Sequence, residues 1–313
     1  MPSNTPGSAS PPPWPTQIAY QDALQDPASA FSDPELRTAV PEDLTPFGLP
    51  QPITGQYANV YRMRTADGSL VAVRLFLRDV AGRSLVYAAL REHLRTLGAP
   101  PPFLTPMDYQ EQGIRCEGAW YPLVRMPWVA GVPLNAYVEA VLNEPDALRR
   151  LRRTLFELAE GLSQAQIAHG DLQHGNLLVE PETGALSLVD YDGVFVPALA
   201  GRVAGREAGH PAYQHPGRTV RDYGPLMDRF SLLVLQAALA ILMREPEFWY
   251  RLDNGDNLLF RREDFAAPET SRAFALLAQS RDGEVRAAAQ VLRDACNGPL
   301  ARVPLAARVL PLP

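Results

Sequence analysis

One run of residues constrains this chain more than any other. It reads His169-Gly170-Asp171-Leu172-Gln173-His174-Gly175-Asn176, and Asp190 follows fourteen residues after Asn176. The short apolar stretches 177–179 and 186–189 lie between Asn176 and Asp190, and their pattern predicts two strands of a hairpin. An acid, an amide and a second acid in this order are typical of sites that hold Mg²⁺ and orient a hydroxyl for phosphoryl transfer. The alternative is that all three are ordinary turn residues.

The chain changes character along its length, from strand-like patterns to helical ones. Residues 57–64 and 70–76 read as strands around the turn 66–68, and 103–110 and 120–128 are further strand candidates. A helix is expected over 83–97. After Gly131 the pattern is helical, with one apolar stripe at Leu148, Leu151, Leu155, Leu158 and Leu162. We expect the arginine pairs 149–150 and 152–153 to form the solvated face of that helix, and 230–243 to be a buried helix.

The N-terminal segment and the composition exclude several classes of partner. Residues 1–16 are rich in Pro and Ser and are expected to be disordered, whereas 17–48 is expected to pack on the lobe that follows. The net charge of −6 and the pI near 5.5 argue against nucleic acid or an anionic membrane as partner. No signal peptide is visible, and Cys116 and Cys296 have no metal-type spacing. These features predict a cytoplasmic protein.

Further motifs carry a resemblance to a known family. Val71-Ala72-Val73-Arg74 ends the second strand, Gly209-His210-Pro211-Ala212-Tyr213-Gln214-His215-Pro216 follows the acid-amide-acid set, and Asp228 opens an apolar helix. The chain resembles the eukaryotic-type protein kinase superfamily, and more narrowly a bacterial kinase-like group with an HGDLQHGN catalytic loop and VAVR in place of VAIK. The resemblance implies an α+β bilobal fold. Its small, antiparallel β-rich N-lobe would span 49–129 and its larger helical C-lobe 130–313.

The resemblance also implies a site for ATP and Mg²⁺. Asp171 would be the catalytic base, and Asn176 and Asp190 would hold metal. Asp192 would point the same way as Asp190 in an extended chain and could join them. The residues implied to contact the nucleotide are Gly55, Ala58, Val60, Ala72, Arg74, Met126, Pro127 and Val129. Asp228 is expected to be structural, either bracing the catalytic loop or capping its own helix.

The chain departs from the family pattern at several points. It contains no lysine, so Arg74 stands where the family has the lysine that contacts phosphates. The position of that lysine's usual glutamate partner falls on Leu90, and the nearest acid, Glu92, is expected to face solvent. Gly170 replaces the family's arginine, which binds a phosphorylated activation segment. The corresponding segment 191–218 contains neither Ser nor Thr, so activation by Ser/Thr phosphorylation there is not expected.

Three functions remain open on these residues. The first is an ATP- and Mg²⁺-dependent kinase acting on Ser or Thr of a protein substrate. The second is a pseudokinase that binds nucleotide or scaffolds a partner. The altered Lys–Glu pair favours it, and so does Gly55, the single glycine that remains where the family has a glycine-rich loop over the nucleotide. The third is a small-molecule kinase, against which the segment 209–216 counts. A zinc site at the pairs His169/His174 and His210/His215 is a weaker interpretation, because no cysteine lies near them in sequence.

Overall fold

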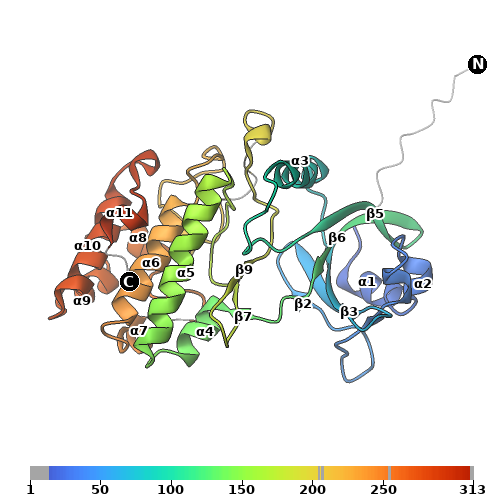
Figure 1. Ribbon diagram of the computed structural model, residues 1–313, viewed down its shortest axis with the longest axis horizontal. Helices are drawn as coiled ribbons and strands as arrows, with labels where there is room; N and C mark the ends of the chain where they lie inside the picture. The colour runs from blue at the N-terminus through green and yellow to red at the C-terminus, as the bar shows by residue number, and fades with distance from the viewer. Residues whose placement is uncertain (1–13, 204, 206–207, 253–254, 311–313) are drawn as a thin grey trace, which may run out of the picture. The chain divides into compact units, whose positions relative to one another are not determined.

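The protein has a mixed α+β architecture (Figure 1). The computed structural model describes residues 14–203, 205, 208–252 and 255–310, so most of the predicted disordered tail lies outside the described residues. The chain divides into two compact units. The first comprises Met1–Ser84 and Pro106–Trp128, and the second comprises Leu85–Thr105 and Val129–Pro313. The second unit therefore takes 85–105, a segment that the sequence interpretation placed in the N-lobe.

The first unit is built on an antiparallel sheet. Its order is β1 (Val40–Pro41), β3 (Ala58–Arg64), β4 (Leu70–Phe76), β6 (Ala119–Pro127) and β5 (Asp108–Cys116), and β2 (Ile53–Thr54) also pairs with β3. The predicted strands at 57–64, 70–76 and 120–128 are confirmed to within one residue. The candidate strand 103–110 was wrong, because the strand here begins at Asp108. Pro106, which has no N–H for a ladder, interrupts the run, and Leu104 forms an isolated bridge with Leu188 instead.

Strand register gathers one set of side chains on one face of this sheet. Val60 pairs with Arg74, and Ala72 pairs with both Arg62 and Met126. Because directly paired residues share a face and alternate residues of a strand share it too, Ala58, Val60, Ala72, Arg74 and Met126 all lie on the same side.

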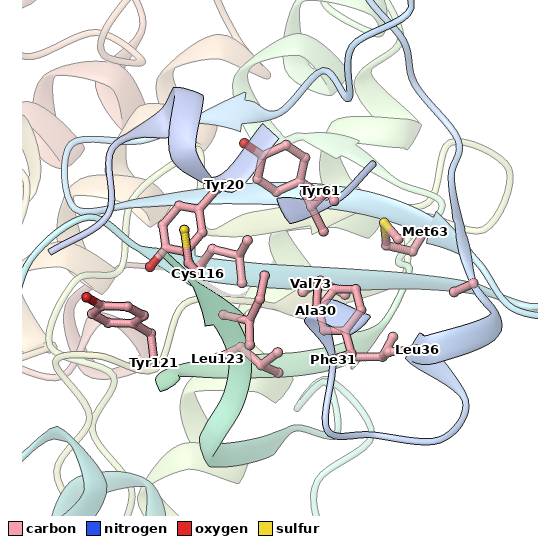
Figure 2. Close-up of a cluster of buried hydrophobic side chains, with 14 of the residues drawn as sticks. Tyr20, Ala30, Phe31, Leu36, Tyr61, Met63, Val73, Cys116, Tyr121 and Leu123 are labelled. Carbon is pink, nitrogen blue, oxygen red and sulfur yellow. The ribbon is translucent and has the colours of Figure 1, made fainter. Parts of the chain in front are cut away.

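The opposite face is covered by the N-terminal segment (Figure 2). Here α1 (Gln17–Ala23), α2 (Pro27–Ala30) and the 3₁₀ turn η1 (Leu36–Thr38) bury apolar side chains against the strands. The core of this layer is formed by Tyr20, Leu24, Phe31, Leu36, Tyr61, Met63, Val73, Ile114 and Leu123. The Tyr20 hydroxyl donates to the Phe76 carbonyl at 2.7 Å. Residues 17–39 are thus part of the core of the first unit.

An ionic contact holds the same layer in place. Asp33 accepts hydrogen bonds from the Glu35 and Leu36 amides and from Gln110, and it pairs with Arg125 at 3.1 Å. Burial alone would raise the pKa of Asp33. The hydrogen bonds and the Arg125 charge outweigh that effect, so the pKa lies below its usual value.

The second unit begins within α3 (Arg83–Thr96) and combines a small sheet with helices. The sheet has the order β7 (Val132–Pro133), β8 (Leu177–Val179), β9 (Leu186–Leu188). The helices after α3 are α4 (Leu134–Ala140), α5 (Pro145–Gln164), α6 (Arg229–Leu242), α7 (Phe248–Leu252), α8 (Arg262–Ala266), α9 (Arg272–Ala278), α10 (Gly283–Asn297) and α11 (Ala306–Val309). Three 3₁₀ turns complete the unit: η2 (Pro197–Leu199), η3 (Pro211–Tyr213) and η4 (Leu300–Arg302). Helices α5, α10 and α11 contact the apolar α6, and α5 and α10 lie beside it in Figure 1.

The helical predictions for this unit hold with one correction. The leucine stripe of α5 is buried, and α6 is the expected buried helix. Arg152, however, does not belong to a solvated face. It is buried, its Nε donates to Gln236 Oε1, and Gln236 Nε2 donates back to the Arg152 carbonyl, each at 3.2 Å. The polar residue that makes this burial possible lies on α6, far away in sequence.

Across the described ranges, no helix combines the length and the apolar character needed to cross a membrane.

Truncation of the N-terminal layer should destabilise the first unit. Leu24, the C-cap residue of α1, is fully buried, whereas Ile18, six residues earlier on α1, is 70% exposed. We expect Leu24→Ala to lower the free energy of unfolding by about 2–5 kcal/mol through lost burial and an unfilled cavity. Ile18→Ala should change it by less than about 0.5 kcal/mol. Denaturant unfolding of both variants measures this, and equal effects would show that residues 17–39 lie loosely on the sheet.

Candidate functional site

The acid and the amide of the sequence motif are in direct contact. Asn176 Nδ2 donates to Asp171 Oδ2 at 3.0 Å and to the Asp171 carbonyl at 2.9 Å. The amide of Val189 donates to the Asn176 carbonyl at 3.1 Å, which ties the end of β9 to the loop before β8. Asp190 is the next residue. The fold therefore brings Asp171, Asn176 and Asp190 to one end of the β8–β9 hairpin.

Asp190 has an unusual backbone conformation. Its φ is +68°, in the left-handed region that non-glycine residues rarely adopt. The backbone is therefore not extended at Asp190. The expectation that Asp192 could join Asp190 at the metal stays a prediction. Tyr191, between them, donates to the Thr105 and Leu188 carbonyls at 3.0 and 2.9 Å, and burial raises the pKa of its phenol. Asp192 Oδ1 accepts from the Tyr87 hydroxyl at 2.7 Å.

A buried carboxylate holds the start of the loop 169–176. Asp228 Oδ2 accepts from the His169 amide at 2.5 Å, and Oδ1 accepts from the Gly170 amide at 2.8 Å. Burial raises the pKa of Asp228, while His169, the two amides and Arg218 oppose that rise. The Asp228 side chain makes no capping bond to α6. Of the two structural roles expected for Asp228, the geometry shows the loop brace.

Gly170 is also held at its carbonyl oxygen. Arg218 Nη2 donates to the Gly170 carbonyl at 2.9 Å, and Nη1 bonds Gln214 and the Met227 carbonyl. Burial lowers the pKa of Arg218, and the charges of Asp228 and Asp171 oppose that effect. Gly170 itself has φ +86°, and a Cβ there would lie 2.5 Å from the Gly193 carbonyl oxygen. A larger residue at position 170 could therefore be accommodated only by a shift of the Gly193 backbone.

The segment 209–216 lies against Asp171. The His210 amide donates to Asp171 Oδ1 at 2.6 Å. A Cβ at Gly209, which has φ +78°, would lie 2.8 Å from the Gly170 carbonyl oxygen and 2.9 Å from Asp171 Oδ1. Both oxygens of Asp171 are thus hydrogen-bonded, one to Asn176 and the other to this segment.

Three rings surround that contact. His174, His210 and Tyr213 pack edge-on or tilted with centroids 5.5–5.8 Å apart, and His174 Nδ1 lies 2.8 Å from the Tyr213 hydroxyl. His210 Nε2 donates to Asp256 at 3.1 Å. Burial, and to a lesser degree His210, lower the pKa of His174.

His215 attaches the segment to the helical core. Its Nε2 donates to the Ala295 and Gly298 carbonyls at 3.1 and 3.0 Å, while its Nδ1 accepts from the Gly217 amide at 3.0 Å. The accepting Nδ1 requires the neutral ring, and burial lowers the pKa of His215.

The part of the chain that the structure describes holds no group of three or more His, Cys, Asp or Glu side chains that could bind a metal ion, and this leaves the zinc interpretation without a site. The pair Asn176 and Asp190 is not such a group, because Asn176 contributes an amide. Since Asn176 Nδ2 donates to Asp171, its Oδ1 is the atom that could serve a hard cation such as Mg²⁺.

The residues expected to contact nucleotide lie mostly in the first unit. Ala58, Ala72, Arg74 and Met126 are buried on the shared face of the sheet and Val60 is half-buried there. The Arg74 guanidinium lies 5.8 Å from the Phe76 ring centroid. Gly55 is exposed, and its amide donates to the Ala58 carbonyl at 2.9 Å. Pro127 ends β6, and Val129 belongs to the second unit.

On α3, Leu90 is buried, and Glu92 is exposed and pairs with Arg95 at 3.0 Å. Glu92 faces solvent as expected.

Sequence reasoning missed Tyr87 and Arg218. Neither residue stands at a motif position. The signal in the sequence was a polar side chain close to a motif position: Tyr87 lies one helical turn before Leu90, and Arg218 follows the Gly209–Pro216 run.

No family model matches this chain, and no curated protein matches it either.

Substitution at Gly170 should be far more costly than at a glycine in open space. Gly201 also has a left-handed φ, +70°, but a Cβ there meets nothing within 4 Å. We expect Gly201→Ala to cost about 1–2 kcal/mol of stability. Gly170→Ala should cost roughly 1–3 kcal/mol more, because its methyl group meets backbone atoms. Thermal or denaturant unfolding tests this, and equal costs would contradict the close packing of the loop on Gly193.

Acid should weaken the second unit through His215. Its folded-state pKa lies below the ordinary value of 6.5, so the unfolded chain binds the proton more readily. Stability is then complete above pH 6.5 and falls as the pH drops below it. Replacement by Gln removes the titrating ring, so His215→Gln should show a shallower fall between pH 7 and pH 5. Unfolding free energies measured across that range decide the matter, and identical slopes would contradict it.

Proposed function

We propose that this chain is an ATP- and Mg²⁺-dependent phosphotransferase of the protein-kinase type, acting on a Ser or Thr hydroxyl of a protein. In this proposal the two units are the two lobes of a bilobal kinase-like fold. The observation that carries it is the cluster at the end of the β8–β9 hairpin. There Asn176 bonds Asp171, and Val189 bonds Asn176 and so brings Asp190 beside them.

Asp171 is the proposed catalytic base. The acceptor oxygen forms a bond to the γ-phosphorus, the bond from that phosphorus to the ADP oxygen breaks, and the hydroxyl proton passes to the Asp171 carboxylate. Its bonds to Asn176 and to the His210 amide fix the carboxylate in one orientation. Such fixed geometry is how a positioned group contributes to rate.

Asn176 and Asp190 are the proposed Mg²⁺ ligands. An amide oxygen and a carboxylate suit a hard cation, which keeps several water ligands of its own. Bound Mg²⁺ would neutralise charge on the phosphates. The left-handed conformation of Asp190 also supports a functional role, since strain of this kind persists where surrounding contacts enforce it.

The shared face of the first unit's sheet is the proposed nucleotide surface. Small and apolar side chains at Ala58, Val60, Ala72 and Met126 suit a flat base, and Arg74 supplies a positive charge on the same face. Arginine binds phosphate as a planar fork, whereas lysine acts as a point charge. Gly55, Pro127 and Val129 complete the proposed set through backbone groups.

The acceptor is proposed to be a protein because a built segment faces the base. Gly209 and His210 lie against Asp171, and His215 anchors the same segment to the carbonyls at the end of α10. A small alcohol would not need such a platform. A cytoplasmic location remains a prediction.

The pseudokinase alternative is favoured by one observation. Leu90 is buried at the position where the family has an acidic partner for the strand-β4 cation, and Glu92 faces away. A protein that bound nucleotide without transferring phosphate would fit that change. Nucleotide binding without turnover in any acceptor mixture is the result that would select it.

Calorimetric titration of a non-hydrolysable ATP analogue, with and without Mg²⁺, tests the proposal. We expect Mg²⁺-dependent binding, and Asp190→Asn should weaken the Mg²⁺ effect by more than about 100-fold, because even an outer-shell change costs about 10–100-fold. Asp171→Asn should keep binding but abolish transfer from labelled ATP to a generic protein acceptor. Glu92→Gln is the matched control and should bind like the wild type.

No binding up to about 1 mM, the upper end of typical substrate constants, would refute the nucleotide site. Binding that is indifferent to both Mg²⁺ and Asp190 would refute the assignment of the metal ligands.

A further inference from the structure

Helix α3 makes a partly buried polar contact with the segment that follows β9. The Tyr87 hydroxyl donates to Asp192 Oδ1 at 2.7 Å, and Tyr87 is only 2% exposed. Both residues belong to the second unit. A hydroxyl that donates to a carboxylate makes a short, charge-assisted bond, stronger than one between neutral groups.

The position of Tyr87 on α3 explains why this contact exists. Residues three apart on a helix share a face, so Tyr87 lies beside the buried Leu90. The exposed Glu92 is two residues beyond Leu90 and pairs with Arg95 instead. The buried side of α3 therefore reaches the segment after β9 through a tyrosine hydroxyl, whereas the family pattern has a glutamate on this helix at the position of Leu90.

Asp192 lies within a segment whose other residues are also anchored. Tyr191 bonds two carbonyls, and the Gly193 carbonyl packs closely against Gly170. Asp190, at the start of the segment, holds a left-handed φ of +68°. Non-glycine residues keep that conformation only when neighbouring contacts determine it. The Tyr87–Asp192 bond supplies such a contact two residues away.

We infer that Tyr87 and Asp192 are a positioning pair, which ties α3 to the segment after β9 and so holds the Asp190 carboxylate in place for the metal. The inference rests on the proposed function for the role of Asp190. It assigns Asp192 to positioning and leaves metal binding to Asn176 and Asp190. Neither Tyr87 nor Asp192 touches substrate in this assignment.

Tyr87→Phe is the decisive variant, because it removes one oxygen and keeps the ring. Two readouts are needed: amide hydrogen exchange over 190–194, and the Mg²⁺ dependence of ATP-analogue binding. We expect exchange in 190–194 to be at least tenfold faster and the Mg²⁺ affinity to fall about tenfold. Tyr20→Phe is the matched control, since it loses a buried hydroxyl bond of the same 2.7 Å length in the first unit. It should alter neither readout.

A double-mutant cycle isolates the contact from general loosening. Asp192→Ala removes both oxygens that could accept from the Tyr87 hydroxyl, so Tyr87→Phe should have a much smaller effect in that background than in the wild type. Equal effects in both backgrounds would overturn the pairing.

The outcomes separate this inference from the proposed function. Unchanged exchange and unchanged Mg²⁺ dependence in Tyr87→Phe would overturn the inference while the proposed function stands. Faster exchange in a protein whose wild type shows no Mg²⁺-dependent binding would support the anchor and refute the function. Faster exchange with an unchanged Mg²⁺ affinity would overturn the positioning role.

Discussion

The arrangement of the second unit depends on a carboxylate buried at the start of its central helix. Asp228 accepts the amides of His169 and Gly170, and those residues lead directly into Asp171. A charge so deeply buried is tolerable only with such donors and with the nearby Arg218. In turn, Arg218 donates to the carbonyl oxygen of Gly170. Gly170 is thus held at both its amide and its carbonyl, in the two peptide groups that lead into Asp171.

The same constraint explains two glycines and agrees with the absence of Ser and Thr from residues 191–218. Gly170 and Gly209 lie so close to backbone atoms of their neighbours that a methyl group would collide at either position. Because the segment 209–218 is joined to the loop through His210 and Arg218, and to the end of α10 through His215, its order does not require an added phosphate. That agrees with a segment that contains neither Ser nor Thr between 191 and 218.

In the first unit, the buried core and the proposed nucleotide residues lie on opposite faces of one sheet. The N-terminal helices bury the face that carries Tyr61, Met63, Val73 and Leu123, and the Asp33–Arg125 pair secures the layer. The other face carries the proposed nucleotide residues. Successive side chains of a strand point to opposite faces, so core residues and proposed binding residues alternate along β3 and β4. A substitution at one of these positions leaves its neighbours on their own faces.

The sequence by itself determined the local elements and the acid-amide-acid set. Period-two and period-three-to-four patterns predicted β3, β4, β6, α3, α5 and α6, and the hairpin spacing predicted that Asp190 returns to Asn176. Only the tertiary structure decided the contacts between distant segments: Asp228 with Gly170, Arg218 with Gly170, Tyr87 with Asp192, and the burial of Arg152 by Gln236. Local periodicity reports which side of an element is apolar, and it contains no information about the polar group that a distant segment presents to that side.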